Sequence, residues 1–304
     1  MTLPSSLRHG GRDVLLKYHK FNSGLEELPA NSLAALERVL AGDVAVLEFD
    51  IGLLGDGNFA VLHDARLERE TTGVGALANI DRATLKQLRL RGSDELPATL
   101  EDVVERLLAH QQPLKVQVDL KEVLPLADEA AAALVEALDR LRSNPKLRVV
   151  VGCLADWNLR QLRRLDQELL VGFDPAFHLH APTPELSLPL PTRVNAYNYL
   201  DDHPLGYRRW QPVSSYLVDR LDTLLNQVPA TEVYLHKAFI VQALQDGFNP
   251  VEFCHVHSSC LVDVWTLNSG DPGFDDDLVT VLDAGVDQIT TDTPLSLAAR
   301  GEQL

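Results

Sequence analysis

The sequence predicts an α/β protein with a (β/α)8 fold, the TIM barrel. Short apolar or alternating segments take turns with amphipathic segments along most of the chain, and about eight such strand and helix pairs can be counted. The chain has 304 residues, of which 45% are hydrophobic, as is typical of a globular α/β protein. No Gly-x-Gly-x-x-Gly motif follows a predicted strand and no Gly-Lys-Ser loop occurs, which disfavours a dinucleotide-binding fold.

The expected elements follow from hydrophobic spacing, with a period of two for strands and about 3.6 for helices. The predicted barrel strands cover residues 13–19, 46–51, 113–121, 147–153, 169–173, 232–236, 261–267 and 286–290. The predicted helices cover residues 32–42, 100–111, 127–143, 157–167, 216–227, 240–246 and 274–284, with a further helix near residue 295.

We expect residues 1–304 to form a single barrel domain, because no long linker divides the chain. Two segments break the alternation and are interpreted as insertions. Residues 65–96 are polar and weakly periodic, and they form a small insertion after the second barrel unit. Residues 175–212 are rich in proline, histidine and aromatic side chains.

Segment 44–64 places acids on a strand that otherwise resembles a buried one. Because successive side chains of a strand alternate between its faces, Glu48 and Asp50 share one face and the apolar side chains share the other. A turn at residues 55–57 then returns the chain to His63. Two neighbouring buried carboxylates need a cation, which favours a hard metal ion with oxygen ligands. The alternative is an exposed strand with solvated acids.

Polar side chains also end other predicted strands. The carboxyl ends of barrel strands meet at one mouth, so residues that are distant in sequence can form one site there. We therefore expect the following residues to lie together, with Asp292 as a further candidate: His19, Glu48, Asp50, His63, Asp119, Lys121 and Trp265. An ordinary ion pair is an equal alternative for Asp119 and Lys121, and a core position is an equal alternative for Trp265. Asn31 and Asp292 are interpreted as helix-capping residues.

Charge and cysteine content limit the partners and the compartment. The net charge of −17 and the pI near 4.9 argue against a nucleic-acid partner or an anionic membrane surface, since both require clustered Lys and Arg. No apolar segment resembles a signal peptide or a transmembrane span, so a cytoplasmic location is expected. Cys153, Cys254 and Cys260 lack metal-ligand spacing and are expected to be reduced and mostly buried.

The order of the motifs resembles the glycerophosphodiester phosphodiesterase family of TIM-barrel enzymes. The resemblance spans almost the whole chain, and the small insertion at 65–96 lies where the family carries one. The matching segments are His19-Lys20-Phe21, Pro29-Ala30-Asn31-Ser32, Glu48-Phe49-Asp50, His63-Asp64, Asp119-Leu120-Lys121, Trp265-Thr266-Leu267-Asn268, Gly285-Val286-Asp287 and Thr291-Asp292.

The resemblance implies metal-dependent hydrolysis of a small glycerophosphodiester to an alcohol and glycerol 3-phosphate, as in lipid and glycerol metabolism. One divalent cation, Ca²⁺ or Mg²⁺, would be the cofactor, since oxygen ligands suit hard cations. The implied roles are metal ligands for Glu48, Asp50 and Asp119, acid and base for His19 and His63, and substrate contacts for Lys20, Lys121 and Trp265. Which histidine is the acid, which metal is bound and which oligomer forms stay open at this stage.

Four positions depart from the family pattern: Lys20 replaces arginine, Phe21 glycine, Ala30 glutamate and Asp119 the longer glutamate. These departures favour two alternatives. One is a non-catalytic barrel that binds a phosphorylated ligand. The other is a related phosphodiesterase that acts on lysophospholipids or cyclic diesters, for which an apolar groove built from Phe21 and residues 175–212 would be evidence.

Overall fold

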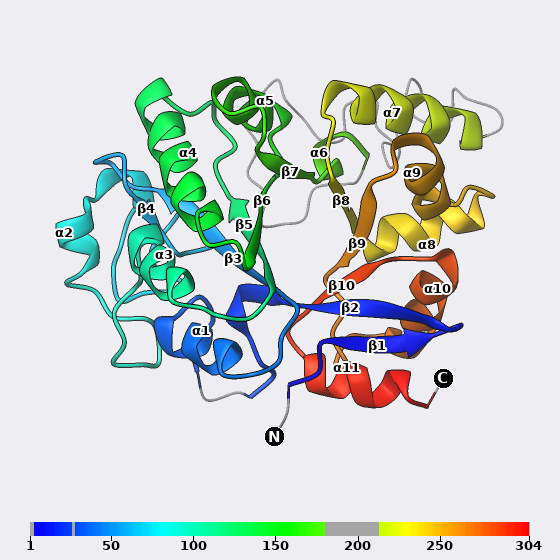
Figure 1. Ribbon diagram of the computed structural model, residues 1–304, viewed down its shortest axis with the longest axis horizontal. Helices are drawn as coiled ribbons and strands as arrows, with labels where there is room; N and C mark the ends of the chain where they lie inside the picture. The colour runs from blue at the N-terminus through cyan, green and yellow to red at the C-terminus, as the bar shows by residue number, and fades with distance from the viewer. Residues whose placement is uncertain (1–2, 26–27, 180–212, 304) are drawn as a thin grey trace.

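A computed structural model of the chain describes residues 3–25, 28–179 and 213–303. Within these residues eight parallel strands close into a barrel, and helices surround it (Figure 1). The barrel closes because β2 (Arg12–Tyr18) pairs with both β3 (Val46–Leu53) and β10 (Gln288–Thr291). The remaining barrel strands are β5 (Leu114–Leu120), β6 (Leu147–Cys153), β7 (Leu170–Phe173), β8 (Glu232–His236) and β9 (Leu261–Trp265). The predicted TIM barrel is confirmed.

The helices of the outer ring follow the strands in sequence. They are α1 (Leu33–Leu40), α3 (Leu100–Leu108), α4 (Asp128–Arg142), α5 (Asp156–Leu165), α7 (Val213–Gln227), α8 (Lys237–Gln245), α9 (Pro250–Ser258), α10 (Phe274–Ala284) and α11 (Pro294–Gly301). Local signals set several ends: Ser32 caps α1, a capping box begins α3, and Gly285 ends α10 with φ of 102°. Helix α9 was not predicted, and α8 begins three residues earlier than expected, at Lys237.

The hydrophobic core lies between the strands and the helices. Outward-facing strand residues such as Leu47, Phe49, Val116 and Val118 are fully buried in one large cluster with the apolar faces of the helices. This arrangement accounts for the alternation in the sequence, because every second strand residue faces the helices. The helices therefore shield the outer face of the barrel from water.

The lumen of the barrel is polar and contains ion pairs. Lys115 on β5 reaches across to Glu232 on β8, with 2.7 Å between Nζ and Oε1. Gln288 on β10 donates a hydrogen bond to the other oxygen of Glu232, at 3.1 Å. Barrel interiors are more often filled by branched apolar side chains. The inward faces of these strands therefore carry charge that must be balanced within the lumen.

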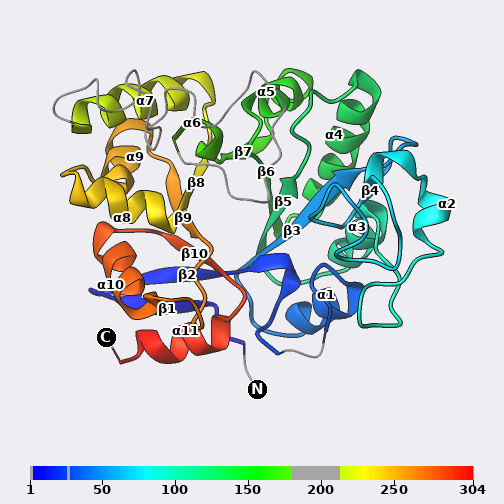
Figure 2. The ribbon, with the colours of Figure 1, turned by 180° about the vertical axis from the view of Figure 1, so that it is seen from behind.

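Two additions flank the barrel. A short strand β1 (Ser6–His9) forms an antiparallel hairpin with β2 and lies beside α11, near both chain ends (Figure 2). Strand β4 (Phe59–Ala60) pairs with β3 and leads into the predicted insertion, which contains the 3₁₀ helix η2 (Leu77–Asn79) and α2 (Arg82–Leu85). A second, small hydrophobic cluster packs the insertion against the segment around β4, and its members are Leu54, Ala60, Leu62, Leu67, Leu77, Leu85 and Leu90.

The second predicted insertion, at 175–212, falls mostly outside the described residues. Its beginning forms a short helix α6 (Ala176–Leu179). The three cysteines are free and buried, as expected. In the described part of the chain no helix has the length and the apolar character needed to cross a membrane.

A close approach between two neighbouring strands explains one glycine. A Cβ atom built on Gly172 would lie 1.9 Å from the hydroxyl oxygen of Tyr234 and 2.2 Å from its Cζ atom. Neither atom can move away freely, because Tyr234 is 3% exposed and tightly enclosed. Gly172 on β7 thus makes room for the ring of Tyr234 on β8.

We predict that Gly172→Ala lowers the free energy of unfolding by about 1–3 kcal/mol, the usual cost of overpacking a filled interior. Gly270→Ala is the matched control, because a Cβ atom there meets nothing within 4 Å. Urea denaturation measures both variants. Equal stability of the two would contradict the close approach.

Candidate active site

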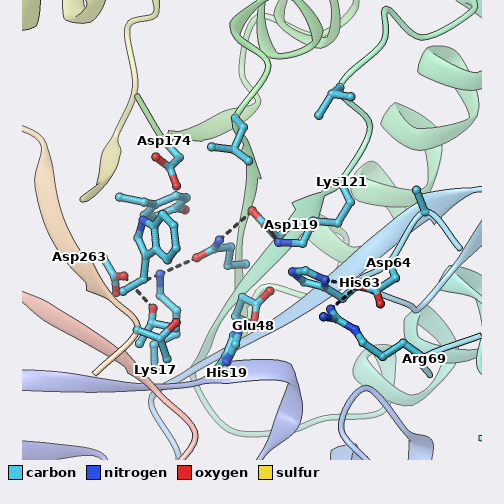
Figure 3. Close-up of a pocket in the computed structure, with 18 of the residues that line it drawn as sticks. Lys17, His19, Glu48, His63, Asp64, Arg69, Asp119, Lys121, Asp174 and Asp263 are labelled. Atoms are coloured by element: carbon cyan, nitrogen blue, oxygen red, sulfur yellow. Dashed lines mark hydrogen bonds and ion pairs between the residues drawn. The ribbon is translucent and has the colours of Figure 1, made fainter. Parts of the chain in front are cut away.

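A cavity of about 540 Å³ opens at the carboxyl ends of the barrel strands (Figure 3). It is lined by six of the residues that were predicted to meet: His19, Glu48, His63, Asp119, Lys121 and Trp265. Asp50 lies behind this surface, fully buried and in contact with Lys121. The structure therefore brings the predicted residues together at the mouth, where distant strands converge.

Glu48, Asp50 and Asp119 form the acidic cluster of the site. One carboxylate oxygen of each lies within 4.8 Å of the others, and β3 and β5 place Asp50 and Asp119 side by side in the sheet register. The alternation of β3 puts both of its acids on the lumen side, as predicted from the sequence. These three oxygens have the spacing and the chemistry of ligands for a metal ion.

Lysine side chains neutralise part of this acidic charge. Lys121 Nζ lies 2.9 Å from Asp50 Oδ1 and 2.6 Å from Asp119 Oδ2. Lys20 Nζ lies 3.8 Å from Asp50 Oδ2. Glu48 accepts a hydrogen bond from the backbone N–H of Lys20, and within the described residues it has no ammonium partner. The ion pair that was an alternative for Asp119 and Lys121 is thus present inside the acidic cluster.

The two acids of β3 respond differently to burial. Burial, together with the neighbouring charges of Asp50 and Asp119, raises the pKa of Glu48 well above its usual value. Burial alone would also raise the pKa of Asp50, but Lys121 and Lys20 outweigh it and hold this pKa far below the usual value. Asp50 is therefore ionised, whereas at Glu48 the lysines do not outweigh burial and the neighbouring acids.

Each histidine at the mouth is oriented by a carboxylate. His63 Nδ1 lies 2.8 Å from Asp64 Oδ1, which Arg69 also contacts at 2.5 Å. Glu70 fixes the loop by accepting hydrogen bonds from the backbone N–H groups of His63 and Asp64. Burial, followed by the charge of Lys121, lowers the pKa of His63. This ring is consequently neutral at neutral pH, with its Nδ1 directed at Asp64.

His19 is oriented in the same way by the carboxylate of Asp292, which directly follows β10. Its Nδ1 lies 2.8 Å from Asp292 Oδ1, and Asn268 Nδ2 donates to Asp292 Oδ2 at 2.9 Å. Burial raises the pKa of Asp292, but the hydrogen bond with His19 outweighs it, so this pKa lies below its usual value. The capping role predicted for Asp292 is wrong: helix α11 begins after Thr293, and Asp292 orients a histidine instead.

The capping role predicted for Asn31 is also wrong. Ser32 caps α1, whereas Asn31 Nδ2 donates a hydrogen bond to Asp50 Oδ2 at 2.9 Å. Asn31 has a positive φ of 60°, which places its side chain toward β3 rather than toward the helix. Sequence reasoning missed this contact because a polar side chain before a helix is compatible with both roles.

Lys20 and Phe21 occupy the turn after β2, in the 3₁₀ helix η1 (His19–Phe21). Both have positive φ, 54° for Lys20 and 60° for Phe21. Glycine adopts this conformation most easily, which explains why the resembled family motif has glycine where this chain has Phe21. Phe21 is fully buried against Phe49, with ring centroids 5.1 Å apart, and lies in the core. Neither residue lines the cavity, so Phe21 does not contribute to an apolar groove there.

Several cavity residues were not predicted from the sequence: Lys17, Gln117, Arg69, Asp174 and Asp263. Gln117 and Lys17 had a signal, since each precedes a predicted site residue by two positions on the same strand face. Asp174 directly follows β7, where barrel sites draw their residues. Arg69 belongs to the insertion, and no periodicity marks it.

The fold and the site together define a TIM-barrel protein with an acidic cluster and two carboxylate-oriented histidines at the strand ends. Residues 24–296 match the model of the glycerophosphoryl diester phosphodiesterase family. The chain belongs to this family, as the motifs predicted.

Curated relatives are similar over about half of the chain. A probable glycerophosphodiester phosphodiesterase 1 from Mycobacterium tuberculosis is 28% identical over 168 residues, 49% of this chain and 61% of the relative. Glycerophosphodiester phosphodiesterase 1 from Mus musculus is 32% identical over 157 residues, 49% of this chain and 46% of the relative. The chain thus spans less than two thirds of the length of these relatives.

Solved structures resemble the fold over nearly the whole chain. An Oleispira antarctica phosphodiesterase in complex with the product sn-glycerol-3-phosphate has a TM-score of 0.63 at 18% identity, covering 94% of this chain and 96% of that one. A putative glycerophosphodiester phosphodiesterase from Galdieria sulphuraria has a TM-score of 0.65 at 14% identity, covering 94% and 97%. At these identities the similarity establishes the barrel fold.

Asp174 makes stability depend on pH. Burial raises the pKa of its carboxyl group from 3.8 to about 8. The folded protein therefore keeps this proton up to about pH 8, whereas the unfolded chain loses it near pH 4. The contribution of the Asp174 carboxyl group to the free energy of unfolding is therefore fully present below its pKa in the unfolded chain. It is lost as the pH rises through its pKa in the folded protein.

We predict that Asp174→Asn becomes progressively more stable than the wild type between pH 4 and pH 8, by at most about 1.4 kcal/mol per pH unit. Asparagine retains the oxygen that accepts the hydrogen bond from the Ala176 backbone. Urea denaturation at several pH values measures the difference, with the exposed Asp139→Asn as control. Parallel pH profiles of wild type and Asp174→Asn would refute the prediction.

Proposed function

We propose that this protein is a metal-dependent phosphodiesterase that hydrolyses a small glycerophosphodiester to an alcohol and glycerol 3-phosphate. The observation that carries the proposal is the placement of two carboxylate-oriented imidazoles, His19 and His63, beside the acidic cluster in one cavity. Membership in the family supports the same chemistry. Residues 1–304 would act as one barrel domain, because His19 after β2 and Asp292 after β10 belong to one site.

The residues fit a divalent cation. Asp50 Oδ1 has no hydrogen-bond partner among the described residues, although the Lys121 ammonium lies 2.9 Å away. Within the same residues Glu48 forms no ion pair. We assign Glu48, Asp50 and Asp119 as the ligands, and Ca²⁺ or Mg²⁺ as the ion, because all three donors are carboxylate oxygens. When bound, such an ion neutralises charge on the phosphate.

The two histidines divide the proton transfers. His63 is the general base in this proposal, because its lowered pKa leaves it neutral and Asp64 holds a proton on Nδ1. Its free Nε2 then accepts a proton from the attacking water or hydroxyl group. His19, held by Asp292, is the general acid and protonates the leaving alcohol.

Lys121 and Trp265 form the substrate-binding surface that we propose. Lys121 carries a firmly held positive charge: burial alone would lower its pKa, but Asp119, Asp50 and Glu48 raise it well above the usual value. Its ammonium group would contact phosphate oxygens. Lys20 does not line the cavity, so we propose that it acts through Asp50, at 3.8 Å, rather than as a replacement for the family arginine.

Two rival functions receive less support from the described residues. A lysophospholipid substrate would be favoured by an apolar groove built partly from Phe21, but Phe21 lies in the core and does not line the cavity. A non-catalytic module would be expected to have lost part of the acid–base pair. Both histidines and both of their orienting carboxylates are in place.

We predict that His63→Ala lowers the turnover of glycerophosphodiesters by at least about 100-fold, the usual contribution of general acid–base catalysis. Affinity for Mg²⁺ or Ca²⁺, measured by calorimetry, should change little. His9→Ala is the control, since His9 pairs with Asp283 far from the cavity. Turnover retained in His63→Ala would remove this residue from the mechanism.

We predict that Glu48→Gln raises the Kd for Mg²⁺ and Ca²⁺ by at least about 10-fold, because loss of even an indirect ligand contact typically has that effect. The substitution keeps the size of the side chain and its acceptor oxygen for the Lys20 backbone N–H. Unchanged metal affinity would count against Glu48 as a ligand, while leaving the histidine prediction untouched.

A further inference from the structure

Lys17 is a buried lysine that the proposed reaction does not use. It lies on β2 inside the barrel with 1% of its surface exposed. Its ammonium group has three partners: Asp263 Oδ2 at 3.0 Å, Gln117 Oε1 at 2.5 Å and the ring of Tyr234, 4.3 Å from Nζ to the centroid. Three partners match the three N–H bonds of an ammonium group, so its position is fixed.

This fixed charge determines how Gln117 is oriented. An ammonium group is only a donor, so the amide oxygen of Gln117 must face Lys17. The amide nitrogen is then directed the other way and donates a hydrogen bond to Asp119 Oδ1 at 3.2 Å. Figure 3 shows Lys17 between Asp263 and the side of the cavity that carries Asp119. The contacts form a continuous path from β9 to the acidic cluster.

Asp263, at the β9 end of this path, is also fixed in position by a hydrogen bond. Asp263 on β9 is 1% exposed, and Thr290 on β10 donates a hydrogen bond to its Oδ1 at 2.7 Å. Lys17 therefore cannot turn away from Gln117 without leaving a buried carboxylate unpaired, which is strongly unfavourable. The orientation of the Gln117 amide is thus determined by residues that do not touch the acidic cluster.

Asp119 is the acid that most needs such support. Its side chain is 19% exposed, whereas that of Asp50 is fully buried and is held by Asn31. Asp119 is also one methylene shorter than the glutamate of the resembled family motif. With Lys121 at Oδ2 and Gln117 at Oδ1, each oxygen of this carboxylate has one contact that fixes its rotation.

We infer that Lys17 and Gln117 are positioning residues that orient Asp119 for the divalent cation and thereby set the metal affinity of the site. The inference rests on the proposed metal site and deepens it. Residues that hydrogen-bond to metal ligands commonly determine affinity in this way, because they restrict the ligand to its binding orientation.

A purely structural role is the competing explanation, and the barrel offers a matched comparison. Lys115 and Glu232 form a second buried ion pair in the same lumen, at 2.7 Å, and neither of them contacts the acidic cluster. If buried lysines only stabilise the lumen, removal of the Lys17–Asp263 pair and removal of the Lys115–Glu232 pair should have the same effect on metal affinity. If Lys17 acts through Gln117, only one pair should affect metal binding.

The test measures the affinity for Mg²⁺ and Ca²⁺ by titration calorimetry on the full chain. The first variant is Gln117→Met, which keeps the length of the side chain and removes the amide. The second is the double variant Lys17→Met with Asp263→Asn, which removes the lysine without leaving its carboxylate charged. The control is Lys115→Met with Glu232→Gln. Thermal unfolding of each variant without metal verifies folding.

We expect both test variants to raise the metal Kd by about 10- to 100-fold and the control to stay within about twofold of the wild type, whatever the changes in Tm. Wild-type affinity in folded Gln117→Met would overturn the inference and leave the proposed function intact. An equal loss in the control would overturn it as well, since the effect would then be general. A wild type that bound neither cation would overturn the proposed metal site itself.

Discussion

The structure depends on the balance of buried charge inside the barrel. Lys17, Lys115 and Lys121 and a larger number of acids occupy the lumen and its mouth, where water is largely excluded and an unpaired charge is strongly unfavourable. Lys115 is paired with Glu232 and Lys17 with Asp263, and both pairs are held by hydrogen bonds from β10. At the mouth the balance becomes incomplete, because Glu48 has no cation of its own among the described residues. That imbalance is what makes the mouth suited to a metal ion.

The two faces of each strand serve separate purposes. The outward face packs apolar side chains beneath the helices and supplies most of the hydrophobic stabilisation. The inward face is thereby released from core packing and carries charged residues whose positions the closed hydrogen-bonded barrel fixes to within narrow limits. Residues such as Asp50 and Asp119, on neighbouring strands in register, are consequently held side by side although 69 positions separate them in the chain. A rigid scaffold of this kind suits a site that must place several ligands precisely.

Much of the fold and part of the site could be predicted from residue order. The alternation in segment 44–64 places Glu48 and Asp50 on one face, and the strand count indicates a barrel that gathers strand ends. Asn31 and Asp292 were assigned wrongly, because a polar residue next to a helix has the same local sequence whether it caps the helix or contacts a distant side chain. Lys17 and Gln117 were overlooked although each lies two positions before a predicted site residue, because the contact between them joins β2 to β5 and leaves no mark in the local sequence.

The sequence alone therefore determined the barrel, the faces of its strands and the identity of the acids and histidines, because these follow from local periodicity and from motif order along the chain. Tertiary structure decided which partner each polar group obtains: Asp292 for His19, Asn31 for Asp50 and Gln117 for Asp119. The reason is physical. Hydrogen bonds and ion pairs act over a few ångströms in space, and closure of the barrel brings together residues whose separation along the chain carries no information about that distance.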